Sequence, residues 1–133
     1  MIQIENLSFK YQNEVVLDSC SAEVAPGKLV ALLGSNGSGK STLLNCIMAW
    51  LKPHKGKVLL NGKSVSIMSA SERSASLAIV LSRIASIPMM TVEETLTVGL
   101  NKDQKSHEKL VHWMELCGIS SFAKRNLDTL SDG

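Results

Sequence analysis

The sequence lacks the features that mark membrane-embedded and secreted proteins. Its longest apolar runs, such as residues 29–33, are far too short to span a bilayer. The N-terminal segment has no basic stretch followed by an apolar one, which is the pattern of a secretory signal. We therefore expect a cytoplasmic protein.

Cysteine is scarce and the charges are nearly balanced. No C-x-x-C pair occurs, and the three cysteines lie far apart, at Cys20, Cys46 and Cys117. This spacing argues against a disulfide framework and against a zinc site, so we predict ordinary buried thiols. The net charge of +2 is too small to indicate a nucleic-acid partner. The tightest group of lysines, between residues 52 and 57, is interpreted as a solvated loop.

The pattern of apolar residues indicates an α/β fold in the first part of the chain. Hydrophobic residues make up 44% and charged residues 20%, which suffices for a packed core. Apolar residues alternate with polar ones over 2–9, which predicts a strand. Leu17 and the β-branched residues indicate another strand over 15–24, and a Pro26-Gly27 turn follows. The continuous apolar run 29–33 is typical of a strand covered on both faces, and a helix is expected over 41–50.

The alternation of predicted strands and helices continues to about residue 83. Residues 57–60 read as a strand that ends at an Asn61-Gly62 turn. A short helix is predicted over 71–75 and another buried strand over 77–81. We therefore assign residues 1–83 to an α/β core.

The remainder, residues 84–133, is predicted to be mainly helical. Thr91 and Glu94 have the spacing of a capping box that opens a helix through about residue 98. Spacings of three and four predict a second helix that stops at Gly118 and carries Leu110, Trp113, Met114 and Cys117.

A glycine-rich motif follows the apolar run 29–33. It matches the P-loop pattern G-x-x-x-x-G-K-[ST] in full, with Gly34, Ser35, Asn36, Gly37, Ser38, Gly39, Lys40 and Ser41. Glycines let backbone N–H groups approach phosphate oxygens, and the N-terminus of the following helix adds its positive dipole end. Lys40 is placed to reach the β- and γ-phosphates, and the Ser41 hydroxyl to ligate Mg²⁺. We predict that this segment, with Thr42, binds a nucleoside triphosphate.

A P-loop by itself leaves the class of enzyme open, because kinases, GTPases, motors and transport ATPases all have one. A small-molecule kinase would need a lid with phosphate-binding arginines. The chain has only three arginines, Arg73, Arg83 and Arg125. Further segments are needed to choose among these classes.

Such segments resemble the ATP-binding cassette (ABC) family along essentially the whole chain. Residues 17–28 are similar to the segment before the family's P-loop, and residues 56–63 to the strand and turn after it. Residues 116–119 and 125–130 are similar to the approach to the LSGGQ signature, which other P-loop classes lack. The signature itself is expected at Leu130, Ser131, Asp132 and Gly133. In isolation, Ser-Asp-Gly would be an ordinary turn.

The resemblance implies a P-loop NTPase core with a mainly helical signature subdomain, and it implies ligands and partners. The family has an adenine-stacking aromatic at the position of Tyr11; the alternative is a strand aromatic that packs on a neighbour. Two such domains pair head to tail, so that Ser131 and the Gly133 N–H would contact the γ-phosphate bound by the partner's Lys40. ATP and Mg²⁺, a second ATPase subunit and transmembrane permease subunits are thus expected, with no nucleic acid and a peripheral position on the inner face of the cell membrane.

The sequence departs from the family pattern at two positions. Ser82 stands where the family has the Q-loop glutamine that reaches Mg²⁺ and the membrane subunit, and a serine side chain is too short for that reach. Asp132 replaces the middle glycine of the signature. An acid beside a phosphate is unfavourable unless it points away.

The family's hydrolytic residues follow the signature: the Walker B aspartate, the catalytic glutamate and the switch histidine. The given sequence has no residue after Gly133, and its three histidines, which precede the signature, are interpreted as solvated surface residues: His54, His107 and His112. We expect a fragment of a longer ATPase. The 133-residue chain alone is predicted to bind nucleotide weakly, if at all, and not to turn over ATP.

Residues 60–65, 69–80 and 91–100 resemble ATPases of iron–siderophore, haem and cobalamin importers. We therefore expect an import ATPase. The alternative is a soluble ABC protein that acts on nucleic acid or ribosomes. Such proteins often carry an extra basic or coiled insertion, and none is seen before Gly133.

Overall fold

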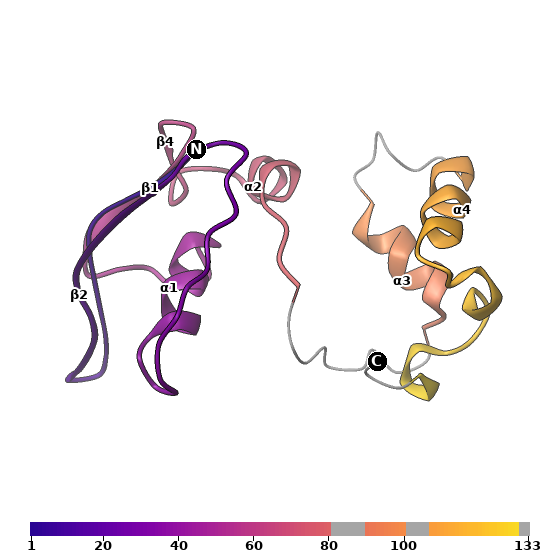
Figure 1. The fold of residues 1–133 in the computed structure, drawn as a ribbon, viewed down its shortest axis with the longest axis horizontal. Coiled ribbons are helices and arrows are strands. Elements are labelled where there is room, and N and C mark those ends of the chain that lie inside the picture. Colours follow the sequence, from indigo (N-terminus) through magenta and orange to yellow (C-terminus); the bar gives the residue numbers. More distant parts are fainter. Residues whose placement is uncertain (81–89, 101–106, 131–133) are drawn as a thin grey trace. The chain divides into compact units, whose positions relative to one another are not determined.

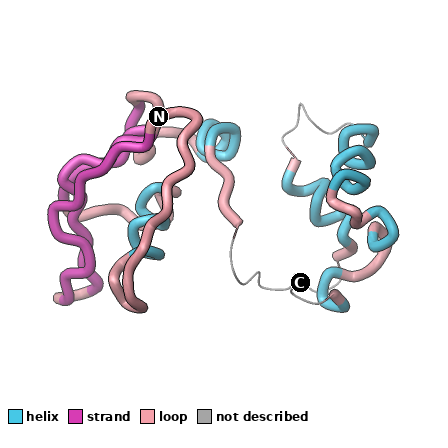
Figure 2. Tube along the Cα trace, in the orientation of Figure 1, coloured by secondary structure: helices cyan, strands magenta, loops and turns pink. Residues whose placement is uncertain are grey.

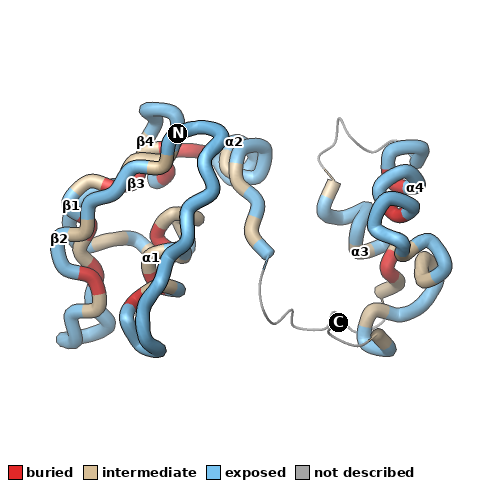
Figure 3. Tube along the Cα trace, viewed as in Figure 1, coloured by how far each residue is buried: buried red, intermediate tan, exposed pale blue. Residues whose placement is uncertain are grey.

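The computed structural model describes residues 1–80, 90–100 and 107–130. It divides into two compact units, Met1–Ala78 and Ile79–Gly133. Both carry secondary structure with buried apolar side chains of their own (Figures 1 and 3). None of the helices in the described residues is long and apolar enough to cross a membrane.

The first unit is built on an antiparallel sheet with the strand order β2-β1-β3-β4, and its strands are magenta in Figure 2. The strands are β1 (Ile2–Tyr11), β2 (Glu14–Val24), β3 (Lys55–Leu60) and β4 (Lys63–Ser64). The strands predicted over 2–9, 15–24 and 57–60 are therefore confirmed. Antiparallel pairing follows from the short connections, because two-residue hairpin loops join β1 to β2 and β3 to β4.

An irregularity in β1 allows three residues of uneven spacing to face one core. Ile4, Leu7 and Phe9 are all buried, although Ile4 and Leu7 are three residues apart. A strand with strict alternation would turn one of them outward. The register with β2 shifts between Ile4 and Leu7, and Asn6 in that step has a φ of 46°. This bulge brings Leu7 back to the core side.

Both predicted turns are present. The Lys28 N–H donates to the Ala25 carbonyl at 3.4 Å across Pro26-Gly27, and Gly27 has a φ of 71°. Between β3 and β4, Asn61 and Gly62 have φ values of 50° and 82°. Two positive φ values in a two-residue loop suit the right-handed twist of a hairpin, and the Asn-Gly pair is the sequence best able to adopt them.

Helix α1 (Lys40–Ile47) confirms the first predicted helix and packs on the sheet. Cys46 is almost completely buried in this core, beside Leu7 and Val58, and burial raises the pKa of its thiol. Cys20 is half-buried, whereas Cys117 is exposed. The prediction of ordinary buried thiols is thus right for Cys46 and wrong for Cys117, because the latter follows the last turn of its helix and faces solvent.

The two predicted buried strands do not form in the described residues. The run 29–33 has no regular secondary structure, Leu29 is fully exposed, and Leu33 is 87% exposed. Residues 77–80 are also irregular, with Val80 94% exposed, and residue 81 lies outside the described part. A strand needs a hydrogen-bonded neighbour and cover for its faces. No described strand pairs with either run, so the apolar pattern remains unpartnered.

Helix α2 (Ala70–Ser76) follows β4 and begins with a capping box that the sequence analysis did not identify. The Glu72 N–H donates to the Ser69 hydroxyl at 3.2 Å, and the Ser69 N–H donates to the Glu72 carboxylate at 2.7 Å. Lys63 also donates to Glu72 at 2.5 Å. These bonds, that of Lys63 foremost, lower the pKa of Glu72 to about 2. A carboxylate in the first turn also suits the helix dipole.

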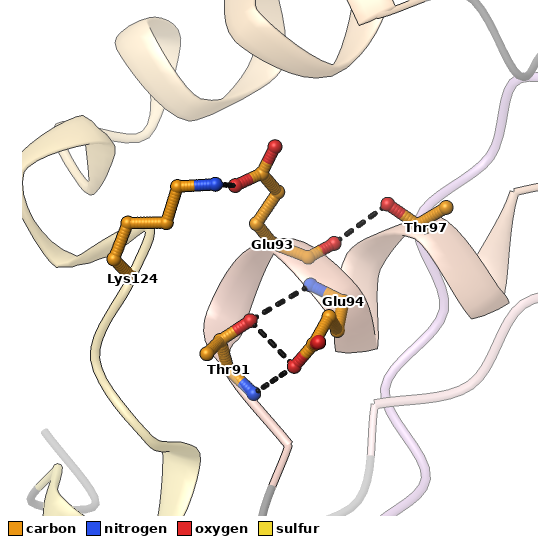
Figure 4. A network of polar contacts seen from close by, with 5 residues as sticks. All are labelled: Thr91, Glu93, Glu94, Thr97 and Lys124. Atoms are coloured by element: carbon orange, nitrogen blue, oxygen red, sulfur yellow. Dashed lines mark hydrogen bonds and ion pairs between the residues drawn. The ribbon is translucent and has the colours of Figure 1, made fainter.

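The second unit contains α3 (Val92–Gly99), α4 (His107–Leu116) and two short 3₁₀ helices, Ser120–Phe122 and Leu127–Thr129. The predicted capping box of α3 is confirmed (Figure 4). The Thr91 N–H donates to the Glu94 carboxylate at 2.8 Å, and the Glu94 N–H donates to the Thr91 hydroxyl at 3.3 Å. Lys124 forms an ion pair with Glu93 from outside the helix.

Helix α4 ends where the sequence predicts. Gly118 has a φ of 69°, and the Ile119 N–H donates to the Met114 carbonyl at 2.9 Å, a bond that closes the end of the helix. Only Leu110 and Met114 of the predicted apolar stripe are buried, against Val92 and its neighbours. Trp113 is 55% exposed, so the stripe is narrower than the spacing suggests.

Candidate functional site

The P-loop connects the irregular run 29–33 to α1. Within it, the Ser38 N–H donates to the Ser35 carbonyl at 3.2 Å. Gly37 and Gly39 have φ values of 83° and 88°, in the left-handed region that favours glycine. The loop is therefore curled, as the glycine spacing predicts.

Strand β2 limits the space around Gly39. A Cβ atom added at Gly39 would lie 2.9 Å from Leu17 Cδ2 and 3.0 Å from the Val16 carbonyl oxygen. Only a residue without a side chain fits this position. The sequence predicts that Val16 and Leu17 belong to a strand, but it does not indicate which residues that strand contacts.

The first turn of α1 offers backbone N–H groups to a ligand. Its N-cap is Gly39, which has no side chain to accept from them, and no acidic residue stands in the first turn. The first helical hydrogen bond runs from the Leu43 N–H to the Gly39 carbonyl at 2.8 Å. The N–H groups that precede Leu43 are left for an anion, and the positive end of the helix dipole lies at the same place.

Lys40 lies across the loop. Its Nζ donates to the carbonyl oxygens of Gly34 at 2.8 Å and Ser35 at 2.7 Å, and to the Ser38 hydroxyl at 3.4 Å. These three contacts use all three N–H donors of the ammonium, so a phosphate would take the place of loop acceptors. Since Lys40 is the first residue of α1, its full positive charge and the first-turn N–H groups belong to the same end of one helix, an arrangement suited to a polyanion.

Ser41 and Thr42 follow Lys40 and differ in exposure. Ser41 is exposed, and within the described residues its hydroxyl makes no hydrogen bond that would compete with a ligand. Thr42 is buried at 7% exposure on α1. The described residues contain no group of three His, Cys, Asp or Glu side chains that could hold a metal. A hydroxyl together with phosphate oxygens and water is a suitable donor set for Mg²⁺, so Ser41 fits that role.

Tyr11 lies at the end of β1, where the β1–β2 hairpin turns. Its side chain is 47% exposed, and its ring meets the edge of Phe9 with centroids 4.9 Å apart. The ring packs on a neighbour, as the alternative from the sequence predicts. Much of it is also accessible, as adenine stacking would require. An exposed aromatic face is what stacking on a purine requires.

The predicted signature is described only at its first residue. Leu130 is half-buried, packs against the core of the second unit, and donates its N–H to the Leu127 carbonyl at 3.2 Å. Ser131, Asp132 and Gly133 lie outside the described residues, as does Ser82. All three histidines are exposed, as expected.

Relatives of known sequence support one family. The chain is 32% identical to the hemin import ATP-binding protein HmuV of Hydrogenovibrio crunogenus, over 100% of this chain and 53% of the relative. It is 33% identical to the Fe(3+) ions import ATP-binding protein FbpC of Brucella abortus, over 99% of this chain and 38% of that protein. An ABC transporter ATP-binding protein of Methanocaldococcus jannaschii is 37% identical over 74% of this chain and 34% of its own length. The chain thus spans from about a third to about half of these three relatives.

Solved structures agree with the sequence comparison. A nucleotide-free ATP-binding cassette from an ABC transporter superposes with a TM-score of 0.76 at 26% identity, covering 98% of this chain and 59% of that one. A dimeric cassette in a post-hydrolysis state bound to ADP and Pi has the same fold, with a TM-score of 0.80 at 21% identity, covering 99% and 64%. The fold is therefore that of the P-loop ATP-binding cassettes. Since residues 17–133 also match the family described as ABC transporter, this chain belongs to the ABC transporter family.

Proposed function

We propose that this chain contributes the ATP-binding site of an ABC transporter's energy-coupling subunit. The observation that carries the proposal is the convergence of the Lys40 ammonium and the uncapped first turn of α1 on one curled loop. A triphosphate tail is the ligand whose charge and oxygen count match these donors. The likeness to a cassette bound to ADP and Pi supports the same ligand class.

We assign separate residues to the phosphate tail, the Mg²⁺ ion and the adenine base of ATP. Residues 34–42 hold the phosphates, with Lys40 on the β- and γ-phosphates and Ser41 on Mg²⁺. Tyr11 stacks on adenine. When bound, Mg²⁺ would neutralise phosphate charge next to the Ser41 hydroxyl. We assign these groups to a nucleotide-binding core of residues 1–83 and the signature to a helical subdomain of residues 84–133.

We further propose the partners expected of an ABC ATPase. A second ATPase subunit pairs head to tail, so that Leu130, Ser131, Asp132 and Gly133 of one chain face the phosphates held by the other. Transmembrane permease subunits dock on the pair at the cytoplasmic face of the membrane, and the position of Ser82 lies in that coupling region. Likeness to a dimeric cassette and to import ATPases supports these partners.

The cargo is proposed to be an iron–siderophore, haem or cobalamin. The import names of relatives at 32% and 33% identity, for hemin and Fe(3+), support iron-related cargo. Deleting the gene should then reduce uptake of radiolabelled iron supplied as haem or siderophore, while uptake of an unrelated nutrient serves as the control. Unchanged uptake of every iron source and of cobalamin would contradict this cargo.

Hydrolysis is expected only of the complete protein. In the family, the Walker B aspartate and the catalytic glutamate follow the signature, and the 133-residue chain has neither. We expect phosphate release from ATP by the complete gene product and none by residues 1–133. If residues 1–133 hydrolysed ATP at the rate of the complete protein, the residues that follow the signature would not be needed for hydrolysis, and the prediction would be wrong.

Substituting Lys40 tests the site directly. We expect Lys40→Met to weaken ATP binding by about ten- to hundredfold, the equilibrium equivalent of one charge-assisted hydrogen-bonding group. The control is Lys52→Met, which removes an exposed lysine of the same unit. Calorimetric titration with ATP gives both values. Equal ATP affinities for the two variants would contradict the proposal that the P-loop binds ATP.

A further inference from the structure

We propose that Phe9 and His54 are positioning residues that hold the Tyr11 ring in the orientation in which it receives a purine. This inference rests on the proposed nucleotide site and names a further part of it. The three rings lie in one row, with the buried Phe9 in the middle and the exposed His54 and Tyr11 at its two ends. They come from two neighbouring strand regions, the end of β1 and the start of β3.

The geometry of the row is that of two edge-to-face contacts. The centroids of Phe9 and Tyr11 are 4.9 Å apart with an interplanar angle of 76°, and those of Phe9 and His54 are 5.6 Å apart at 70°. Both pairs fall in the range where the positive edge of one ring meets the negative face of another. Phe9 is therefore contacted by both of its ring neighbours, and its orientation sets that of Tyr11.

The three rings differ in what holds them in place. His54 precedes β3, and its N–H donates to the Ser8 carbonyl at 2.9 Å, which fixes it beside β1. Phe9 is buried at 7% exposure and is paired with Leu17. The backbone of Tyr11 is paired with Glu14 across the ladder, but its side chain is 47% exposed next to the Gln12-Asn13 turn. The ring, as distinct from the backbone, is therefore restrained by its contact with Phe9.

The row lies on the same side as the phosphate site. Leu17, the partner of Phe9 across the β1–β2 ladder, is also the residue whose Cδ2 would touch a Cβ atom at Gly39. Leu17 thus links the ring row to the P-loop, so a nucleotide whose tail occupies the P-loop can present its base to this end of the hairpin.

Restraining Tyr11 before binding raises affinity for a base but not for a phosphate tail. A side chain that becomes ordered only on binding lowers affinity, by an amount equivalent to about two- to tenfold. If His54 and Phe9 order the ring in the free protein, that loss is avoided. Removing His54 should therefore weaken only ligands that carry a base.

The experiment compares ATP with inorganic tripolyphosphate, titrated calorimetrically into the complete gene product. We expect His54→Ala to weaken ATP binding by about two- to tenfold and to leave tripolyphosphate binding unchanged. His54→Phe keeps a ring against Phe9 and should restore ATP affinity. His107→Ala removes an exposed histidine of the second unit and serves as the matched control.

Each other outcome has a distinct meaning. If Tyr11→Ala weakens ATP binding while His54→Ala does not, or if His54→Ala weakens both ligands equally, the positioning role is wrong. Failure of His54→Phe to restore affinity would also overturn it. If the unaltered protein binds neither ATP nor tripolyphosphate, the proposed nucleotide site itself fails and this inference falls with it.

Discussion

Gly56 shows how one missing side chain shapes the sheet. It has a φ of 76°, and a Cβ atom added there would lie 2.3 Å from the Glu5 carbonyl oxygen and 2.4 Å from that of Asn6. These are backbone atoms at the bulge of β1, so no rotamer change can relieve the overlap. The bulge that keeps Leu7 in the core and the glycine of β3 therefore depend on each other.

At this scale we predict that Gly56→Ala destabilises the first unit strongly. The substitution combines a left-handed conformation with backbone overlap, so a loss of about 2–4 kcal/mol in the free energy of unfolding is expected. Gly62→Ala is the matched control, because Gly62 has a φ of 82° but nothing within 4 Å of the added atom. It should cost about 1–2 kcal/mol. Urea unfolding followed by circular dichroism measures both, and equal losses would contradict the overlap argument.

At the scale of the elements, the α3 capping box was predicted from the sequence because Thr91 and Glu94 lie within one helical turn. The partners of the other N–H groups at this end of α3 could be identified only from the tertiary structure. The Val92 N–H donates to the Arg125 carbonyl at 3.1 Å, and the Glu93 N–H to the Ala123 carbonyl at 3.0 Å. The N–H groups of Thr91, Val92, Glu93 and Glu94 therefore all have partners, two from the capping box and two from a segment some thirty residues onward. The first N–H groups of a helix need such partners because no helical carbonyl precedes them.

The capping box makes a pH prediction. The Thr91 N–H, and then its hydroxyl, hold the pKa of the Glu94 carboxyl below its ordinary value. A carboxyl with a lower pKa in the folded state stabilises it above the unfolded pKa of about 4.3, and this contribution is lost as the pH falls through the folded pKa. We expect Glu94→Gln to be less stable at pH 7 and to lose less stability between pH 5 and 3 than the unaltered protein.

Urea midpoints across that pH range test the capping-box prediction. Glu115→Gln, at an exposed position on α4, is the control and should keep the pH dependence of the unaltered protein. Parallel curves for Glu94→Gln and the unaltered protein would show that the Thr91–Glu94 bonds do not contribute to stability.

The two apolar positions Trp113 and Met114 on α4 should differ sharply. Met114 is 4% exposed in the core of the second unit, whereas Trp113 is 55% exposed. We expect Met114→Ala to cost about 2–4 kcal/mol through lost burial and the cavity it leaves, and Trp113→Ala to cost less than about 1 kcal/mol. Unfolding by urea, followed through helical circular dichroism, gives both values. A larger cost for Trp113→Ala would reverse our assignment of the buried face.

For the molecule as a whole, the exposed run 29–33 is the main departure from an ordinary globular surface. Its residues are apolar, and none of them is buried. Exposed apolar segments of this kind favour association with other apolar surfaces. No strand in the described residues pairs with this run.

We therefore predict that the 133-residue chain self-associates through this run. Leu29→Lys with Leu33→Lys should shift the chain towards monomer in light scattering after size-exclusion chromatography, with no loss of the β signal in circular dichroism. Lysines in place of the exposed Val15 and Ile67 are the control for a general effect of charge. An unchanged mass distribution would show that the run does not mediate association.

Much of the candidate site was predictable because its chemistry is local. The P-loop spacing identified residues 34–42, including the glycines that adopt positive φ values and the lysine that lies across the loop. The contacts of Val16 and Leu17 with Gly39, and of His54 with Phe9, were not predictable, since they join residues far apart in sequence. His54 looked like a solvated histidine, and its exposure agrees, yet its ring packs on the aromatic next to Tyr11.

The sequence by itself determined the elements whose signals lie within a few residues, namely the Pro26-Gly27 and Asn61-Gly62 turns, the P-loop, the α3 capping box and the end of α4 at Gly118. Short-range hydrogen bonds and backbone preferences are set by adjacent residues, so a pattern suffices to predict them. Only the tertiary structure decided which apolar residues are covered: Met114 and not Trp113, β1 and not residues 29–33. Burial depends on partners that sequence spacing does not specify, and a strand that finds none remains an exposed apolar segment.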